Sequence, residues 1–435
     1  MNSLDGYQVV DSYWYDQVPS YWKKTKNKYV FCQDKHVVGE DWEKFTLLTM
    51  GKSGVKPRDM DGGGKFPASF ETYQTVEPNQ LIFCLFDLDE TPRTIGMSKD
   101  YGMITSAYDV FSTTEGNDPQ FWTYFYQMID DHKGLRPFYT GLRKVVRSET
   151  FMGIEVFSPP LEEQKLISRY LDKKTEQIDR LVEKIQKKIE LLKEQRIALI
   201  NQYVTKGLDP NVEMKDSGIE WIGEIPVHWN LNKVGYNTYV KGRIGWKGLT
   251  SEDFIDEGPY LITGTDFNSD GTINWDNVYH VDQKRYDEDP YIQLRDHDVL
   301  ITKDGTIGKI VYVGNLKGQT CLNSGIFITR ATNDEYIQRY FFWVLNSNIF
   351  KAFIKFNSGG STILHLYQNV FVKFKFTIPP IQEQNEIVNY LDKQTKFIDH
   401  LLSNEEKRIK LLREYRCSLI SSAVMGKVRI SEDMI

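Results

Sequence analysis

Residues 159–206 read PPLEEQKLISRYLDKKTEQIDRLVEKIQKKIELLKEQRIALINQYVTK, and residues 379–426 read PPIQEQNEIVNYLDKQTKFIDHLLSNEEKRIKLLREYRCSLISSAVMG. A shift of 220 positions, from 159 to 379, aligns the two stretches without a gap, and nearly half of the aligned positions are identical. The chain is therefore an internal duplication. The identical pairs include Pro159/Pro379, Glu163/Glu383, Gln164/Gln384, Tyr170/Tyr390, Asp172/Asp392, Thr175/Thr395, Asp179/Asp399, Glu194/Glu414 and Arg196/Arg416.

Both stretches have the apolar spacing of a long helix with one buried seam. The Pro-Pro and Glu residues at 159–163 suit a first turn, and Lys206, Gly207 and Pro210 suit an ending. Glu405 stands where the first copy has Ile185, so it either weakens one layer of the seam or marks its register. The predicted seam residues are Ile178, Val182, Ile185, Ile189, Leu192, Leu199, Ile398, Leu402, Ile409, Leu412 and Leu419.

A second repeat lies upstream of each helix. Trp14-x3-Val18-Pro19-x2-Trp22 matches Trp221-x3-Ile225-Pro226-x2-Trp229 at a shift of 207, from 14 to 221. Such a helix could serve only as a homodimeric coiled coil, but the chain order favours an internal pair. If the N-terminal motif docks near the end of the second helix, the two helices run antiparallel. The two variable segments then lie at opposite ends, related by a pseudo-two-fold axis.

The segments between these repeats are predicted to be rich in strands. In the second segment we expect strands at 297–302, 307–313 and 325–330 and a helix at 334–354. In the first we expect strands at 80–86 and 104–111 and a helix at 119–128. Phe151, Ile154 and Val156 align with Phe371, Phe374 and Phe376, so both segments should share a fold and differ in their loops.

Composition restricts the class of protein. The formal net charge is -6, and neither variable segment has an excess of basic residues, so any DNA contact needs local patches or a partner that supplies positive charge. The cysteines Cys32, Cys84, Cys321 and Cys417 lack metal-ligand spacing, which favours a reduced, cytoplasmic protein. No signal peptide is expected, and no apolar run approaches the roughly 20 residues of a membrane span. Most of the aromatic residues are expected to pack in cores.

The sequence offers no catalytic motif that passes its test. Gly51-Lys52-Ser53 lacks the earlier glycine of a phosphate-binding loop, because Thr46 stands there. Ser158-Pro-Pro-Leu161 lacks the aromatic residue of a methyltransferase motif, and its repeat opens a helix. The seven histidines are scattered, so no metal site is expected. The acidic pairs Asp87/Asp89 and Asp296/Asp298 are interpreted as solvated faces or turn caps.

Three motifs resemble those of the specificity subunits of type I restriction-modification systems. Residues 215–229, KDSGIEWIGEIPVHW, are similar to the lead-in of that family's recognition domains, and residues 298–309, DVLITKDGTIGK, to its strand–turn motif. The Pro-Pro-x-x-Glu-Gln helix starts at 159–164 and 379–384 resemble its central conserved regions. The first half keeps only the Trp/Pro/Trp skeleton of the lead-in, and the DGTIGK motif has no clear equivalent there.

The resemblance covers essentially the whole chain and implies an α+β fold in which two target-recognition domains are separated by two long antiparallel helices. The expected boundaries are 1–158 for the first recognition domain, 159–208 for the first helix, 209–378 for the second domain and 379–435 for the second helix. The resemblance implies a DNA sequence-specificity subunit without catalytic activity. Each domain would read one half of a bipartite, asymmetric site, and the helices would set the gap and dock two modification (methyltransferase) subunits, which support restriction (translocase/nuclease) subunits. S-adenosylmethionine, ATP and magnesium would belong to those partners.

Base contacts require Arg, Lys, Asn, Gln, Ser or Thr side chains on loops that can enter a groove. Residues beside glycines are favoured, because glycine allows a close approach of the backbone. The candidates in the first domain are Lys52, Lys56, Arg58, Lys65, Lys99, Arg136 and Arg143, and those in the second are Arg243, Lys247, Lys303, Thr306, Asn323, Ser361 and Thr362.

Two other classes remain open from the sequence. The chain could be a fused methyltransferase or nuclease, in which case the purified chain alone would transfer methyl groups to DNA. It could instead be a scaffold whose domains bind proteins, in which case sequence-dependent DNA binding would be absent even with methyltransferase partners.

Overall fold

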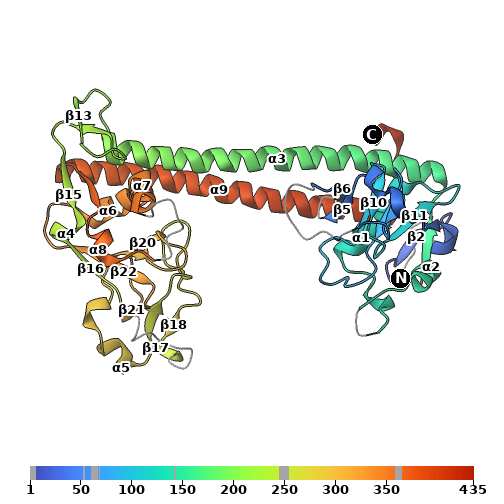
Figure 1. Ribbon diagram of the computed structural model, residues 1–435, viewed down its shortest axis with the longest axis horizontal. Helices are drawn as coiled ribbons and strands as arrows, with labels where there is room; N and C mark the ends of the chain where they lie inside the picture. The colour runs from blue at the N-terminus through green and yellow to red at the C-terminus, as the bar shows by residue number, and fades with distance from the viewer. Residues whose placement is uncertain are drawn as a thin grey trace. The chain divides into compact units, whose positions relative to one another are not determined.

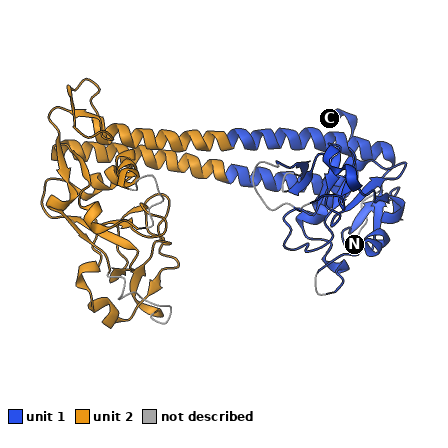
Figure 2. Cartoon of the chain, viewed as in Figure 1, with its two compact units in different colours: residues 1–185, 407–435 blue, residues 186–406 orange. Residues whose placement is uncertain are grey.

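The computed structural model of the chain describes residues 6–51, 54–59, 67, 69–141, 144–243, 254–357 and 365–435. The contacts divide the chain into two compact units (Figure 2). Unit 1 contains residues 1–185 and 407–435, and unit 2 contains residues 186–406. Each unit therefore combines one variable segment with a part of both long helices.

The two repeated stretches form the long helices α3, Leu161–Lys206, and α9, Ile381–Val424 (Figure 1). In unit 2, Lys188, Arg196 and Tyr203 of α3 meet Glu405, Asp399 and Tyr390 of α9. The partners descend along α9 as the residues ascend along α3, so the helices pack antiparallel, as predicted. Gly207, with φ +73°, ends the first helix where the sequence indicated.

Unit 1 is built on the four-stranded antiparallel sheet β4-β11-β8-β9, on which helix α1 packs. Asp118 caps α1 by accepting a hydrogen bond from the Phe121 amide, and Pro119 occupies its first turn. The elements are β1 Tyr7–Val9, β2 Gln17–Pro19, β3 Lys23–Lys26, η1 Asn27–Tyr29, β4 Phe31–Asp34, η2 Gly39–Lys44, β5 Leu48–Gly51, β6 Gly54–Pro57, β7 Gln74–Val76, β8 Leu81–Phe83, β9 Ile95–Met97, β10 Gly102–Ile104, β11 Asp109–Thr113, α1 Pro119–Asp131, η3 Arg136–Phe138, α2 Ser148–Gly153, β12 Glu155–Ser158 and, after α9, η7 Glu432–Met434.

Unit 2 repeats this framework in the sheet β16-β22-β19-β20 and adds the three-stranded sheet β18-β17-β21, in which β17 and β21 are parallel. Its elements are β13 Met214–Asp216, β14 Glu224–Pro226, β15 Asn230–Lys233, α4 Val234–Asn237, β16 Thr238–Lys241, β17 Ile255–Ile262, β18 Tyr279–His280, α5 Gln283–Asp287, η6 Pro290–Ile292, β19 Val299–Thr302, β20 Ile310–Tyr312, β21 Thr320–Leu322, β22 Ile326–Ala331, α6 Gln338–Leu345, α7 Asn348–Asn357, α8 Gln368–Phe371 and β23 Lys375–Ile378.

The two variable segments share one topology. In each four-stranded sheet the spatial order is first, last, second and third strand of the set. The ladder β3–β12 pairs Lys26 with Glu155, and the ladder β15–β23 pairs Lys233 with Lys375, the same register under the shifts of 207 and 220. The common fold expected from the aligned apolar residues is therefore present in both segments.

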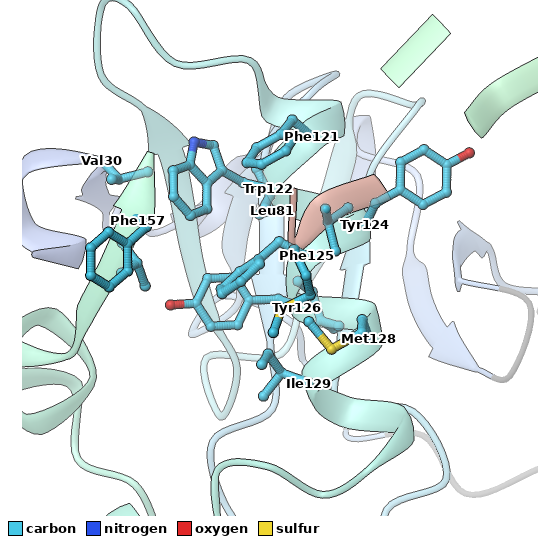
Figure 3. Packing of buried hydrophobic residues seen from close by; sticks show 14 of the residues in the cluster. Val30, Leu81, Phe121, Trp122, Tyr124, Phe125, Tyr126, Met128, Ile129 and Phe157 are labelled. Carbon is cyan, nitrogen blue, oxygen red and sulfur yellow. The ribbon is translucent and has the colours of Figure 1, made fainter. Parts of the chain in front are cut away.

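Aromatic side chains fill the core of unit 1. Phe121, Trp122, Phe125 and Tyr126 of α1 are all buried, and Figure 3 shows them in one cluster with Leu81 of β8. Such rings bury large areas and prefer edge-to-face contacts, as between Trp122 and Phe125 at 81°. This packing accounts for much of the high aromatic content.

Two sequence predictions of secondary structure were wrong in detail. The helix expected at 334–354 is interrupted after Leu345, because the buried Ser347 hydroxyl donates to the Val344 carbonyl and accepts from the Ile349 amide, which starts α7. The strand expected at 104–111 is divided between β10 and β11 by a turn in which the Tyr108 amide donates to the Thr105 carbonyl. The strands β8, β19, β20 and β22 and the helix α1 lie where they were expected.

Within the described part of the chain, none of the helices combines the length and apolar character needed to span a bilayer. Among the same residues, no group of three or more His, Cys, Asp and Glu side chains is placed to hold a metal ion.

Candidate nucleic-acid interface and the joints that carry it

In each unit the second tryptophan of the Trp/Pro/Trp lead-in contacts the end of one long helix and the start of the other. We call this three-way contact the joint. In unit 2, Trp229 Nε1 donates to Glu383 Oε2 at 2.9 Å, at the start of α9. The same indole lies against Gly207, at the end of α3, where an added Cβ would come within 3.1 Å of the ring. The lead-in thus connects the end of one helix to the beginning of the other.

Unit 1 contains the equivalent joint. Trp22 Nε1 donates to Glu163 Oε1 at 3.3 Å, and the ring lies 2.9 Å from a Cβ built on Gly426. The Tyr7 hydroxyl also donates to the Gly426 carbonyl at 2.9 Å. The N-terminal motif therefore docks at the end of α9, which is the arrangement that the antiparallel prediction required.

The repeated Gln and Asp residues fix each domain to its own helix. Gln164 Oε1 accepts from the Asp118 amide in unit 1, and Gln384 Oε1 accepts from the Ile337 amide in unit 2, so each holds the start of the domain helix. About two helical turns further along, Asp172 accepts from the Tyr124 hydroxyl at 2.7 Å. In unit 2, Asp392 accepts from Trp343 Nε1 at 2.8 Å and from Arg339.

These polar anchors explain why the two copies have kept identical residues at those positions. Burial raises the pKa of Asp172, and the hydrogen bond from the Tyr124 hydroxyl partly offsets this by lowering it. Since a half-buried carboxylate needs hydrogen-bond partners, each domain helix must present donors at this level of the long helix.

The seam between the long helices is apolar with one buried acid. Glu405 is only 8% exposed and accepts a hydrogen bond from Lys188 Nζ at 2.6 Å. Of the two interpretations from the sequence, this pairing favours the register marker. The predicted seam residues are all buried or half-buried: Ile178, Val182, Ile185, Ile189, Leu192 and Leu199 in α3, and Ile398, Leu402, Ile409, Leu412 and Leu419 in α9.

The candidate reading surface of unit 2 is the β19–β20 loop, residues 303–309. Thr306 is exposed at its tip, and its carbonyl accepts from the Thr302 hydroxyl at 2.5 Å, which holds the loop closed. The half-buried Lys303 has its Nζ 5.3 Å from the Phe327 ring centroid. Asn323, also half-buried, has its Oδ1 turned to the Ser324 amide at 2.7 Å.

Two side chains at this loop, His365 and Asp304, were not among the candidates predicted from the sequence. His365 Nδ1 is hydrogen-bonded to Asp304 Oδ1, and the Leu366 amide donates to the Lys303 carbonyl. The segment that begins at His365 is therefore joined to the loop. Only the long-range contact reveals this, because the two residues are 61 positions apart.

In unit 1 the β8–β9 connection, residues 84–94, occupies the place of the 303–309 loop. No equivalent of the DGTIGK motif is visible in that part of the sequence, because the connection contains Asp87, Asp89, Glu90 and Arg93, whereas the 303–309 loop contains Lys303, Asp304 and Lys309. Hydrogen bonds from Arg136 at 2.9 Å and from Lys144 lower the pKa of Asp89 to about 2. The same framework thus presents loops of opposite charge.

The structure changes the interpretation of several candidate residues. Arg243 was expected to contact bases, but it is 3% exposed and its Nε donates to the Leu322 carbonyl, so its guanidinium is committed to the interior. Arg136 is exposed but is paired with Asp89. Lys99 is exposed and close enough to Asp172 to act on the pKa of that carboxyl.

The remaining candidates fall into two groups. Lys56 lies in β6 and Arg58 directly follows that strand, and both residues are exposed. The other six candidates, Lys52, Lys65, Arg143, Lys247, Ser361 and Thr362, lie outside the described residues.

The acidic pairs also separate into different roles. Asp298 is 1% exposed and accepts two hydrogen bonds from Arg330, at 2.5 and 2.8 Å. Burial nevertheless raises the pKa of Asp298. Of the two interpretations from the sequence, the turn cap is correct for this residue and the solvated face is not, because Asp298 Oδ2 also accepts from the Arg295 amide at 2.6 Å. Asp296 is likewise structural, since it accepts from the Leu316 amide.

Comparisons with known proteins agree with this geometry. Residues 245–411 match the family described as "Type I restriction modification DNA specificity domain". A putative type I restriction enzyme MjaX specificity subunit of Methanocaldococcus jannaschii is 27% identical over 275 residues, which are 62% of this chain and 59% of that protein. The MjaVIII specificity subunit of the same organism is 24% identical over 291 residues, 66% of this chain and 64% of that protein. The chain thus spans about six-tenths of the length of these curated relatives.

Solved structures resemble the whole fold. A chain described under "Structural basis underlying complex assembly and conformational transition of the type I R-M system" matches with a TM-score of 0.70 at 14% identity, covering 94% of this chain and 99% of that one. The HsdS subunit of Thermoanaerobacter tengcongensis matches with a TM-score of 0.51 at 15% identity, covering 94% and 98%. The α+β fold with two strand-rich domains and antiparallel long helices is thereby confirmed.

Proposed function

We propose that this chain, a relative of the type I restriction-modification specificity subunits, is the DNA sequence-specificity subunit of such a system and has no catalytic activity of its own. Each recognition domain would read one half of a bipartite, asymmetric DNA site. The reactions would be carried out by modification (methyltransferase) and restriction (translocase/nuclease) subunits, to which S-adenosylmethionine, ATP and magnesium would belong.

One observation carries the proposal. The two domains share strand order and ladder register, yet the loop at the same place differs in its charges. It contains Lys303, Asp304 and Lys309 in unit 2, and Asp87, Asp89, Glu90 and Arg93 in unit 1. Loops on a rigid scaffold are where recognition is varied. A duplicated framework with unlike loops suits a ligand with two unlike halves better than it suits one catalytic centre.

The net charge of -6 fits the same proposal. A chain that bound DNA alone would depend on an excess of Lys and Arg for counterion release. We therefore expect specific binding only in the assembled complex, where the methyltransferase subunits complete the positive surface around the DNA.

The proposal is tested by mapping methylated positions in DNA from cells that carry this chain with its methyltransferase. The expected result is methylation at one bipartite motif with a fixed gap, which disappears when this chain is deleted. Methyl transfer by the purified chain alone would favour an enzyme, and methylation that is independent of this chain would favour a scaffold.

The helices are proposed to act as a ruler for the gap. Deleting one heptad from each long helix, so that the seam residues stay in register, should shorten the tolerated gap or abolish recognition, since two reading domains on one DNA face favour half-sites about one helical turn apart. A gap that stays the same in the shortened protein would contradict this part of the proposal.

A further inference from the structure

A surface hollow of about 530 Å³ lies in unit 2, where the β19–β20 loop meets helix α7. Its lining includes Ile307 and Gly308 of the loop and Lys351 and Lys355 of α7. A Cβ built on Gly308 would lie 3.2 Å from Ile354 Cδ1, so the loop and α7 are in direct contact. The hollow therefore adjoins the candidate reading surface of this unit.

The sequence of α7, NIFKAFIKFN, places two lysines on the outer face of the helix. Ile349, Phe350 and Phe353 are buried, whereas Lys351 and Lys355 are exposed. Two lysines that are one helical turn apart lie on the same face and repel each other. Since α7 contains no Asp or Glu that could offset this repulsion, helix stability does not explain the pair.

The lining of the hollow is cationic. In addition to the two lysines it contains Arg196 of α3, and none of the described residues that line it is Asp or Glu. Arg196 is already paired with Asp399. Within the part of the chain that the structure describes, neither Lys351 nor Lys309, at the end of the loop, forms an ion pair. An ammonium group without a carboxylate partner is thus available to an anion beside the loop.

We propose that this hollow binds a phosphate group of the DNA backbone, which Lys351 and Lys355 hold while the adjoining loop presents Thr306 to the base edges. The inference rests on the proposed function, which supplies the DNA, and it adds a site that was not among the candidates predicted from the sequence. The ammonium groups neutralise the phosphate and release counterions, and they read no base. Their role is to fix the position of the loop in the groove.

The exposed part of the hollow favours DNA over a protein partner. Leu345 and Phe350, which belong to the lining, are only 2% and 1% exposed, so the apolar floor is part of the domain core. Among the residues of the lining, only Lys351 and Lys355 are largely exposed, and the others are buried or half-buried. Lysine is depleted at protein–protein interfaces, whereas as a compact, mobile point charge it suits phosphate.

Unit 1 has a carboxylate at the corresponding place. Cys417 of α9 is the counterpart of Ile197, which lines the hollow of unit 2, under the shift of 220. The Cys417 Sγ lies 3.9 Å from Asp131 Oδ2, and Asp131 is paired with Arg93 at 2.9 Å. An anion would meet this acid, so we assign the phosphate site to unit 2 alone.

The test is the salt dependence of DNA binding by the full chain assembled with its methyltransferase, measured by fluorescence anisotropy on a duplex that carries the motif found by methylation mapping. Each phosphate contact that is lost lowers the slope of log K against log salt by about 0.9. Lys351→Gln should show this decrease and bind about fivefold more weakly at about 0.15 M salt. The double variant with Lys355→Gln should show about twice the decrease in slope, and the methylated motif should stay the same.

Lys351→Arg and Lys373→Gln are the controls. Arginine keeps the positive charge, so the slope should remain that of the wild type. Lys373 is exposed in the same unit but does not line the hollow, so its replacement should also leave the slope unchanged. Thermal unfolding should match the wild type in every variant, because these side chains are exposed. A loss of affinity at all salt concentrations with an unchanged slope would mean a structural defect and would overturn the phosphate contact.

A photo-reactive amino acid at position 351 identifies the occupant. Cross-linking to DNA supports the inference, whereas cross-linking to a protein subunit overturns it. An unchanged slope in the double variant also overturns it, and this result is expected if the hollow holds the phosphate of a free nucleotide instead.

The failure of the site can be distinguished from the failure of the proposed function. If the wild-type complex shows no sequence-dependent binding to DNA, the proposed function fails and the phosphate site fails with it. If the wild type binds its motif and the double variant keeps the wild-type slope, only the phosphate site is wrong.

Discussion

Arg196 of α3 donates two hydrogen bonds to Asp399 of α9, at 2.9 and 3.3 Å. The equivalent residues with their roles exchanged, Arg416 of α9 and Asp179 of α3, form the same pair at 3.0 and 3.3 Å. A shift of 220 positions converts one pair into the other. Because each helix supplies the arginine once and the aspartate once, the internal duplication extends to the individual ion pairs within each unit.

The two ion pairs should differ in strength. The Arg196 and Asp399 side chains are 17% and 32% exposed, whereas those of Arg416 and Asp179 are 31% and 57% exposed. A double-mutant cycle with alanine should give a coupling of about 1–2 kcal/mol for the first pair and less than about 1 kcal/mol for the second, since solvent screens an exposed pair. Urea unfolding measures both, and equal couplings would contradict the role of burial.

Replacing Glu405 by Ile should leave the free energy of unfolding unchanged or raise it by up to about 2 kcal/mol. The substitution removes the desolvation cost of a buried carboxylate, and Lys188, which is 54% exposed, can still reach water. The variant restores the residue that the first copy has at Ile185. A loss of more than about 1 kcal/mol in urea unfolding would show that the charged pair stabilises the seam.

Gly207→Ala should destabilise the protein more than Gly218→Ala. Both glycines have a left-handed φ, +73° and +69°, which costs a Cβ-bearing residue about 1 kcal/mol. At Gly207 the new Cβ would also lie 2.7 Å from Glu383 Oε1, whereas nothing lies within 4 Å at Gly218. We expect a loss of about 2–4 kcal/mol against about 1 kcal/mol, and similar losses by thermal unfolding would argue against the closed joint.

Asp172→Asn should change the pH dependence of stability. Burial raises the folded-state pKa of Asp172 above the ordinary value of about 3.9, so the folded protein holds this proton more tightly than the unfolded chain does. Its contribution to stability is therefore complete below about pH 4 and is lost as the pH rises through the folded pKa. Asn is neutral throughout, so the difference between variant and wild type in urea unfolding should grow over that window; a constant difference would contradict the raised pKa.

Lys56→Ala and Lys303→Ala should relax different halves of the recognised sequence. Lys56 belongs to the first domain and Lys303 to the second, and loss of a base contact costs about 1–3 kcal/mol at one position. Methylation mapping should show new bases accepted in one half-site while the other half stays fixed. A uniform loss of methylation without any change of preference would indicate a phosphate contact.

Local patterns in the sequence were sufficient for the long helices. The seven-residue spacing of Ile178, Ile185, Leu192 and Leu199 depends only on the helical period, and Gly207 ends the helix by its own backbone preference. The duplication then predicted the antiparallel packing, because the N-terminal lead-in has to dock at the end of the second long helix. These features require no knowledge of distant partners.

The reading surface depended on contacts that no local pattern contains. Whether Arg243 faces solvent or donates to the Leu322 carbonyl, 79 positions away, is decided by the packing of β16 and β22 against the neighbouring sheet. The pairing of Asp89 with Arg136 joins residues 47 positions apart on two connections that the fold brings together. The sequence by itself therefore determined the helices, their seam and the duplication, whereas the tertiary structure alone decided which charged side chains are exposed, since burial and ion pairing arise only when distant segments pack.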